Sequence, residues 1–136
     1  MLNTWKPIAF LCFSAFVVEF ELMPGNVHLG QSVRMACKWT FNTNYKELVY
    51  YKITSSESME AVWIFKGDGN MSLYNEAETG FDMKFEAQKS NLIAEHNILL
   101  KNAIESDDAR YTCAVNIAGN SYKPFYDSRL TVYGKH

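Results

Sequence analysis

The stretch DDARYTC, residues 107–113, places an acidic pair, a small residue, a tyrosine and a cysteine at fixed offsets late in the chain. Two interpretations of it lead to different functions. In one, the stretch enters a strand of a disulfide-stapled β-sandwich and its residues are architectural. In the other, the thiol of Cys113 is a reactive group beside the carboxylates of Asp107 and Asp108.

Length and composition limit the functions to consider. A chain of 136 residues fits one domain around one core. With 48% hydrophobic and 15% aromatic residues, it is expected to pack as a globular unit rather than remain disordered. The formal net charge is −2, and the sequence shows no cluster of lysine and arginine that could neutralise a phosphate backbone. Nucleic acid is therefore not an expected partner.

The N-terminus has the pattern of an export signal. A short positive segment, residues 1–6, precedes Pro7 and the apolar run IAFLCFSAFVV, residues 8–18. The run is too short to cross a bilayer, which takes roughly 20 residues, but it suits the apolar region of a secretory signal. We therefore expect residues 1–18 to be a signal peptide cleaved somewhere in 14–18. The alternative is that part of the run is a buried first strand.

Export predicts a protein that is secreted or lies on the extracellular face of the plasma membrane. No apolar segment after residue 18 is long enough to anchor the chain, so attachment to a membrane would need a segment absent from this sequence.

The cysteine count supports export. Cys12 lies in the apolar run and would leave with the signal, so that Cys37 and Cys113 remain. In an exported protein such a pair is expected to be bridged. The sequence has no CxxC motif and no paired Cys/His spacing, and its three histidines stand far apart. Neither a metal site nor a cofactor is therefore expected.

Alternation around both cysteines predicts strands with one buried face. In SVRMACKW, residues 32–39, and in RYTCAV, residues 110–115, every second residue is apolar or cysteine and would face the core. Further strands are expected at NVHL, ELVYYKI, AVWIF, DMKFEA, HNILLKN and SRLTVY, residues 26–29, 47–53, 61–65, 82–87, 96–102 and 128–133. Many short strands separated by turn residues indicate an all-β sandwich.

From about Leu22 to Tyr133 the sequence resembles a variable-type (V-set) domain of the immunoglobulin superfamily. The resemblance rests on Pro24-Gly25 and Gly30-Gln31-Ser32-Val33 before the first cysteine, and on Asn102-Ala103, Asp107, Ala109 and Tyr111 before the second. It implies an all-β, immunoglobulin-like V-set β-sandwich of two antiparallel sheets joined by one disulfide. The Ig-like V-type domain would span residues 19–133, and residues 134–136 would begin a linker or C-terminal tail.

The resemblance also implies roles within DDARYTC. Tyr111 would be the tyrosine corner, whose hydroxyl bonds to upstream backbone where the chain enters the strand of the second cysteine. Asp107 would pair with a basic residue at the start of another strand, a place that Lys84 occupies. On this interpretation the stretch is architectural.

Two departures from the family pattern are visible. The family places a tryptophan against the disulfide on the strand after the first cysteine, whereas this chain has Tyr50 there, and Trp39 or Trp63 would supply the missing bulk. The last strand lacks the F-G-x-G turn of antibody and T-cell receptor joining segments, so a rearranging antigen receptor is not expected.

No catalytic residues are expected. Asp107 and Asp108 are adjacent, so on an extended chain their side chains would point to opposite faces and could not act as an acid/base pair. The sequence contains neither a G-x-S-x-G elbow nor a P-loop. We therefore expect no enzyme and no small-molecule substrate.

Binding to another protein is the expected function, through one of two surfaces. One is the loop end of the sandwich, with Tyr45 in one loop and Tyr122, Lys123, Phe125 and Tyr126 in the loop before the last strand. The other is the exposed face of the sheet that contains Cys113, with Tyr51, Trp63 and Phe65. Trp63 and Phe65 share a face, so both are core if either is. Tyr122 and Phe125 have an alternative role as anchors of their loop.

These features favour the outermost domain of a cell-surface receptor used in adhesion or self/non-self recognition. Its partner would be another protein, and a homophilic contact is one option because a two-fold arrangement uses one patch twice. The alternative is a freely secreted soluble receptor or immune effector that binds a heterologous ligand. Asn70, in Asn70-Met71-Ser72, is the only N-glycosylation sequon.

Overall fold

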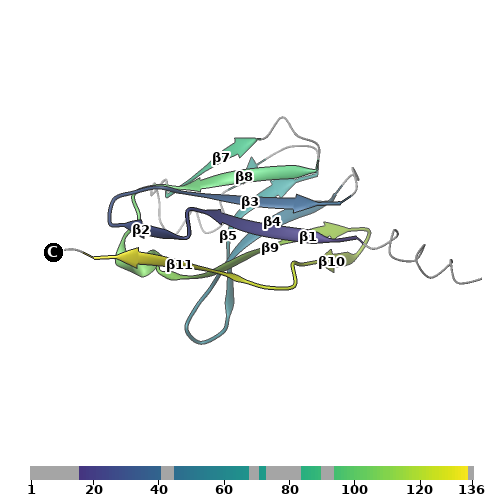
Figure 1. Cartoon of the computed structure of the whole chain (residues 1–136). Helices are drawn as coiled ribbons and strands as arrows, with labels where there is room; N and C mark the ends of the chain where they lie inside the picture. Colours follow the sequence, from purple (N-terminus) through teal and green to yellow (C-terminus); the bar gives the residue numbers. More distant parts are fainter. Residues whose placement is uncertain (1–15, 41–44, 68–70, 73–83, 90–93, 135–136) are drawn as a thin grey trace, which may run out of the picture.

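A computed structural model describes residues 16–40, 45–67, 71–72, 84–89 and 94–134 of the chain. These residues form two β-sheets that pack face to face (Figure 1). The expected signal residues 1–15, including Cys12, and the sequon residue Asn70 lie outside the described residues.

The smaller sheet has the strand order β1-β3-β8-β7, and every neighbouring pair in it is antiparallel. Its strands are β1 (Val18–Met23), β3 (Val33–Trp39), β8 (Glu95–Leu100) and β7 (Phe85–Lys89). Along β3 the residues Val33, Met35 and Cys37 are buried, as their alternation with polar residues predicted.

The larger sheet has the order β2-β11-β9-β4-β5-β6, with β10 also paired to β9. Its strands are β2 (Asn26–His28), β11 (Ser128–Tyr133), β9 (Ala109–Ile117), β4 (Glu47–Ile53), β5 (Met59–Lys66), β6 (Met71–Ser72) and β10 (Asn120–Tyr122). The pairing of β2 with β11 is parallel, whereas the other pairs are antiparallel. A short 3-10 helix, η1 (Glu105–Asp107), leads into β9.

A disulfide joins the two sheets at the centre of the core. Cys37 of β3 and Cys113 of β9 are bonded, with their Cα atoms 6.3 Å apart, and neither is exposed. The predicted fold class is confirmed: the protein is an immunoglobulin-like β-sandwich with one disulfide between its sheets.

Tyr50 lies beside this disulfide, directly opposite Cys113 in the ladder of β4 and β9. Its ring packs edge-on against Phe20 and Phe65, and its hydroxyl donates a 2.6 Å hydrogen bond to the backbone carbonyl of His96. A buried phenol is tolerated when its hydroxyl has such a partner. Burial raises the pKa of Tyr50 well above its ordinary value, so the group remains a donor.

The DDARYTC stretch is held by internal bonds. The hydroxyl of Tyr111 donates to the backbone carbonyl of Asp107 over 2.7 Å, which is the contact that a tyrosine corner requires. The carboxylate of Asp107 accepts from the backbone N–H of Ile104 and pairs with Lys84 Nζ at 2.8 Å. Burial and, secondarily, the charge of Asp107 raise the pKa of Tyr111.

Asp108 binds different groups from its neighbour. Its carboxylate accepts the backbone N–H of Val132 over 2.9 Å and pairs with Arg129. Cys113 is in the disulfide and so is not a free thiol. Both acidic residues therefore stabilise the junction of η1, β9 and β11, whereas the cysteine joins β9 to β3 of the other sheet.

The first strand begins inside the apolar run that the sequence assigned to the signal. Val18 is the first residue of β1 and is buried. The N–H of Val17 donates to Thr40 Oγ1, and the N–H of Thr40 donates to the carbonyl of Val17, each over 3.1 Å. The part of the run from Phe16 onward therefore belongs to the sandwich, in line with the alternative interpretation of it as a buried strand.

Candidate recognition surface

The most exposed aromatic side chains lie between β10 and β11, in residues 123–127. Among the described residues Phe125 is 88% and Tyr126 83% exposed, whereas the remaining exposed large hydrophobic residues reach 51% at most. Isolated exposed apolar residues are ordinary, but here two consecutive aromatic residues are almost wholly exposed.

This 123–127 segment runs beside the sheet rather than at the loop end of the sandwich. Tyr122 lies opposite Val115 of β9, and Ser128 lies opposite Tyr111. Residues 123–127 therefore pass residues 112–114 of β9, and the excess length makes the segment bulge out from the ladder. The true turn of the hairpin is formed by Ala118 and Gly119, both with positive φ.

The N-terminal end of the 123–127 segment is anchored by Tyr122. Its ring is partly buried against the core and lies 4.7 Å, centroid to centroid, from the ring of Phe16. Tyr122 is therefore an anchor, the alternative role that the sequence allowed for it. Lys123 follows it, exposed and without an ion pair among the described residues.

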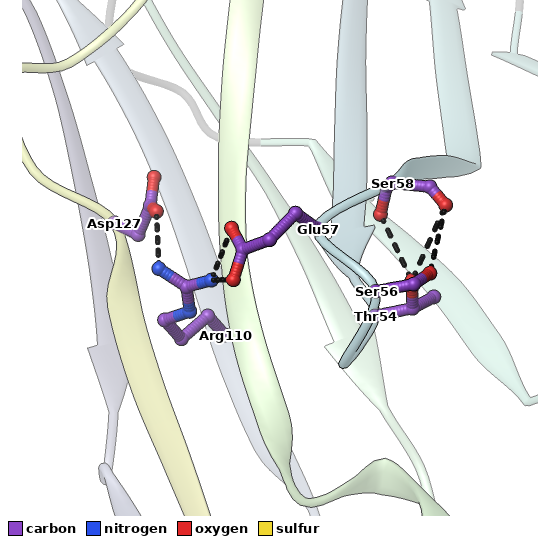
Figure 2. Close-up of polar contacts among 6 residues, drawn as sticks. All are labelled: Thr54, Ser56, Glu57, Ser58, Arg110 and Asp127. Atoms are coloured by element: carbon purple, nitrogen blue, oxygen red, sulfur yellow. Dashed lines mark hydrogen bonds and ion pairs between the residues drawn. The ribbon is translucent and has the colours of Figure 1, made fainter.

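The C-terminal end of the segment is anchored by charge. Asp127 accepts a hydrogen bond from Arg110 Nη1 over 3.3 Å, and Arg110 Nη2 donates to both carboxylate oxygens of Glu57 at 2.9 and 2.8 Å. Figure 2 shows Arg110 between the two acids, with Glu57 reaching toward it from the loop between β4 and β5. This network connects the segment to β9 and to that loop.

The β4–β5 loop has its own polar contacts on the side away from Arg110 (Figure 2). The hydroxyl of Thr54 lies 3.0 Å from that of Ser56 and 3.3 Å from that of Ser58. Glu57 sits between these serines with a φ of 68°, a conformation that costs a non-glycine residue of order 1 kcal/mol. The hydroxyl contacts and the Arg110 pair together hold that conformation.

The outer face of the large sheet carries a band of apolar and small residues next to the 123–127 segment. In the ladders, Val49 lies opposite Ala114 and Ile64, and Tyr51 lies opposite Thr112 and Ala61. These residues point away from the core because their neighbours along each strand belong to it. Tyr51 is partly exposed and Val49, Ile64 and Ala114 are nearly covered, so the accessible band is narrow.

Two residues expected on this outer face lie in the core instead. Trp63 is 7% exposed and Phe65 is fully buried, and they lie opposite Tyr50 and Leu48, both core residues. Alternation correctly placed Trp63 and Phe65 on one face, but that face points inward. A register shift beside Tyr51 leaves Val62 unpaired as a bulge, and the outward residues of β5 include Ala61, Ile64 and Lys66.

Tyr45 is also an anchor rather than an open contact residue. Its hydroxyl is 2.7 Å from His96 Nε2, and its ring meets Trp39 edge-on at 5.5 Å. Of the eight residues proposed for binding, the structure leaves Lys123, Phe125 and Tyr126 exposed, buries Trp63 and Phe65, and leaves the other three, Tyr45, Tyr51 and Tyr122, partly exposed.

Sequence reasoning missed Arg110, Glu57 and Asp127, which are distant in sequence. Their charges gave no local signal, since a pairing between three elements depends on strand order. Val49 and Ile64 were also missed. Val49 could have been found, because residues two apart on a strand share a face and Tyr51 was already expected on the outer face of β4.

Within the described part of the chain, no group of three His, Cys, Asp or Glu side chains is arranged to hold a metal ion. The described residues also include no helix of the length and apolarity that crossing a membrane requires.

No protein-family model matches this chain, and no curated protein is similar to it in sequence.

Proposed function

We propose that this chain is an exported, variable-type immunoglobulin domain that recognises another protein and has no enzymatic activity. The observation that carries the proposal is the exposure of Phe125 and Tyr126, at 88% and 83%, in a segment anchored at both ends. Two consecutive aromatic side chains in water contribute nothing to the packing of the core, whereas a protein interface draws most of its binding energy from such side chains.

The strand order supports the variable type. Variable domains differ from constant ones by two additional strands that extend the sheet of the second cysteine. Here β5 and β6 continue that sheet beyond β4, and the other sheet contains β1, β3, β8 and β7.

The anchoring of the 123–127 segment supports a role in binding. Binding through a segment that is already fixed costs less conformational entropy, because the segment does not have to become ordered when the partner binds. Tyr122 fixes the segment at one end and the Arg110–Asp127 pair at the other, while Pro124 restricts the backbone between them. Lys123 would act mainly on the rate of association, because exposed charges steer encounter more than they add affinity.

We propose further that the domain is the membrane-distal unit of a cell-surface receptor for adhesion or self/non-self recognition. The 123–127 segment passes one side of β9, and β4, which carries the partly exposed Tyr51, pairs with the other side of β9. A second copy of the domain is one candidate partner, since a two-fold contact uses one patch twice.

The test begins with sedimentation of the oxidised domain over a range of concentrations, together with aggregation of beads coated with it. Domains that self-associate identify the partner as a second copy. A monomeric domain is next displayed as a tetramer against an arrayed panel of extracellular protein domains.

The decisive comparison is between the double variant Phe125→Ala/Tyr126→Ala and the control Ile104→Ala. Ile104 is the next most exposed large hydrophobic among the described residues, at 51%, and lies outside the proposed surface. The double variant should bind at least about tenfold more weakly, because each anchor is worth about 2 kcal/mol. Undiminished binding by the double variant, with weaker binding by Ile104→Ala, would contradict the proposed surface.

A further inference from the structure

We infer that Phe16 is a positioning residue for the 123–127 segment, so that the functional protein must begin at or before Phe16. The effect on binding rests on the proposed function, whereas the effect on the segment can be tested without any partner.

The residues before β1 are held by both side chain and backbone. The ring of Phe16 packs against that of Tyr122 with an interplanar angle of 53°, and it also contacts the core cluster. Val17 and Thr40 exchange two hydrogen bonds, one through the Thr40 hydroxyl and one through its N–H. This reciprocal pair fixes the backbone next to Phe16, so the position of its ring is defined by the fold.

Phe16 acts on the exposed aromatic pair through one intermediate residue. Tyr122 ends β10, where it lies opposite Val115, and Lys123 and Pro124 are the only residues between it and Phe125. Without the Phe16 ring, one face of Tyr122 loses its packing partner, which weakens this end of the segment. The other end is held by the Arg110–Asp127 pair. That pair is exposed, and exposed ion pairs contribute about 0 to 1 kcal/mol.

This arrangement restricts where the signal can be cleaved. The sequence allows cleavage anywhere in 14–18, but cleavage after Phe16 or later would remove the partner of Tyr122. Cleavage after Ser14 meets the preference for small residues at the recognised positions, because Cys12 and Ser14 are both small. A protein cut after Phe16 or Val17 would keep its disulfide and the buried Val18 but lose the order of the 123–127 segment.

The first test is to express the full chain in secreting cells and to measure the mass of the exported protein. The protein should begin at Ala15 or Phe16. A chain that begins at Val17 or later and still holds the 123–127 segment in order overturns the inference.

The second test compares Phe16→Ala with Phe20→Ala in that exported protein. Phe20 is an appropriate control because it is a partly buried phenylalanine of β1 whose ring meets Tyr50 in the core rather than Tyr122. Both variants lower the thermal midpoint, so each is assayed at the same interval below its own midpoint. The readout is the rate of chymotrypsin cleavage after Phe125 and Tyr126, with fragments identified by mass.

Phe16→Ala should speed cleavage at Phe125 and Tyr126 at least about tenfold over Phe20→Ala, and amides in residues 121–126 should exchange faster. Phe16→Tyr, which keeps an aromatic ring, should restore slow cleavage. Equal cleavage rates in the two alanine variants would show a general loss of stability and overturn the positioning role. Faster cleavage with unchanged partner binding would instead support the positioning role and contradict the proposed function.

Discussion

The corner around Tyr111 and the 123–127 segment contain the same kinds of residue in opposite environments. Each combines tyrosine with an aspartate and a nearby cation. At the corner Tyr111 is 1% exposed and its hydroxyl is bonded to Asp107, whereas Tyr126 is 83% exposed and projects into water. The comparison teaches that composition alone does not separate a structural tyrosine from a solvent-exposed one, and that burial with satisfied partners does.

The largest effect should come from removing the disulfide, which belongs to the corner side of the comparison. Cys37→Ala with Cys113→Ala should lower the free energy of unfolding by about 2 to 5 kcal/mol, the usual cost of losing a native disulfide in a small exported domain. Denaturant unfolding measures this directly. A loss below about 1 kcal/mol would mean that the core holds the sheets together without the bridge.

Tyr111→Phe sharpens the comparison by removing one oxygen atom. This substitution should lower the free energy of unfolding by about 1 to 3 kcal/mol, because the buried carbonyl of Asp107 loses its hydrogen-bond donor. Tyr126→Phe is the matched control and should leave unfolding unchanged, since its hydroxyl is in solvent. Equal effects of the two substitutions on the unfolding midpoint would remove the distinction between them.

High pH should act on the corner through its buried phenols. The folded-state pKa values of Tyr50 and Tyr111 are raised above the ordinary 10.0, chiefly by burial. Their contribution to stability is therefore complete below about pH 10 and is lost as pH rises toward the folded values. Urea unfolding from about pH 8 to about pH 11 should show this fall, and Tyr111→Phe should make it shallower. If the free energy of unfolding of Tyr111→Phe fell with pH as steeply as that of the wild type, the pH dependence would belong to groups other than Tyr111.

Ala118→Gly should have a smaller effect, and of opposite sign. Ala118 has a φ of 49° in the two-residue turn between β9 and β10, a region that favours glycine. The substitution should raise the free energy of unfolding by up to about 1 kcal/mol. Ala114→Gly, in the middle of β9, is the control and should lower it by roughly 0.5 to 1 kcal/mol. A loss of stability in Ala118→Gly would indicate that the alanine methyl is packed.

Much of the corner was predictable because its signals are local. The cysteines sit on alternating strands, and within DDARYTC the hydroxyl of Tyr111 bonds to the backbone of Asp107, four positions away. The register of each strand is then restricted by the requirement to bury one of its faces.

The candidate recognition surface was less predictable because it depends on long-range geometry. Alternation gives two faces for β5 but does not say which is the core, so the sequence left both faces open for Trp63 and Phe65, and the structure buries them. The start of β1 at Val18 was obscured because the apolar core of a signal and a buried strand have the same composition. The excess length of the 123–127 segment appears only once Tyr122 and Ser128 have been paired with β9.

The most direct test of the central claim is the affinity of Phe125→Ala/Tyr126→Ala for the partner found by sedimentation or by the extracellular array, measured beside its unfolding free energy. The account predicts binding at least about tenfold weaker, with stability within about 0.5 kcal/mol of the wild type. Unchanged affinity, or an affinity lost only because the domain unfolds, would contradict the separation of recognition from architecture.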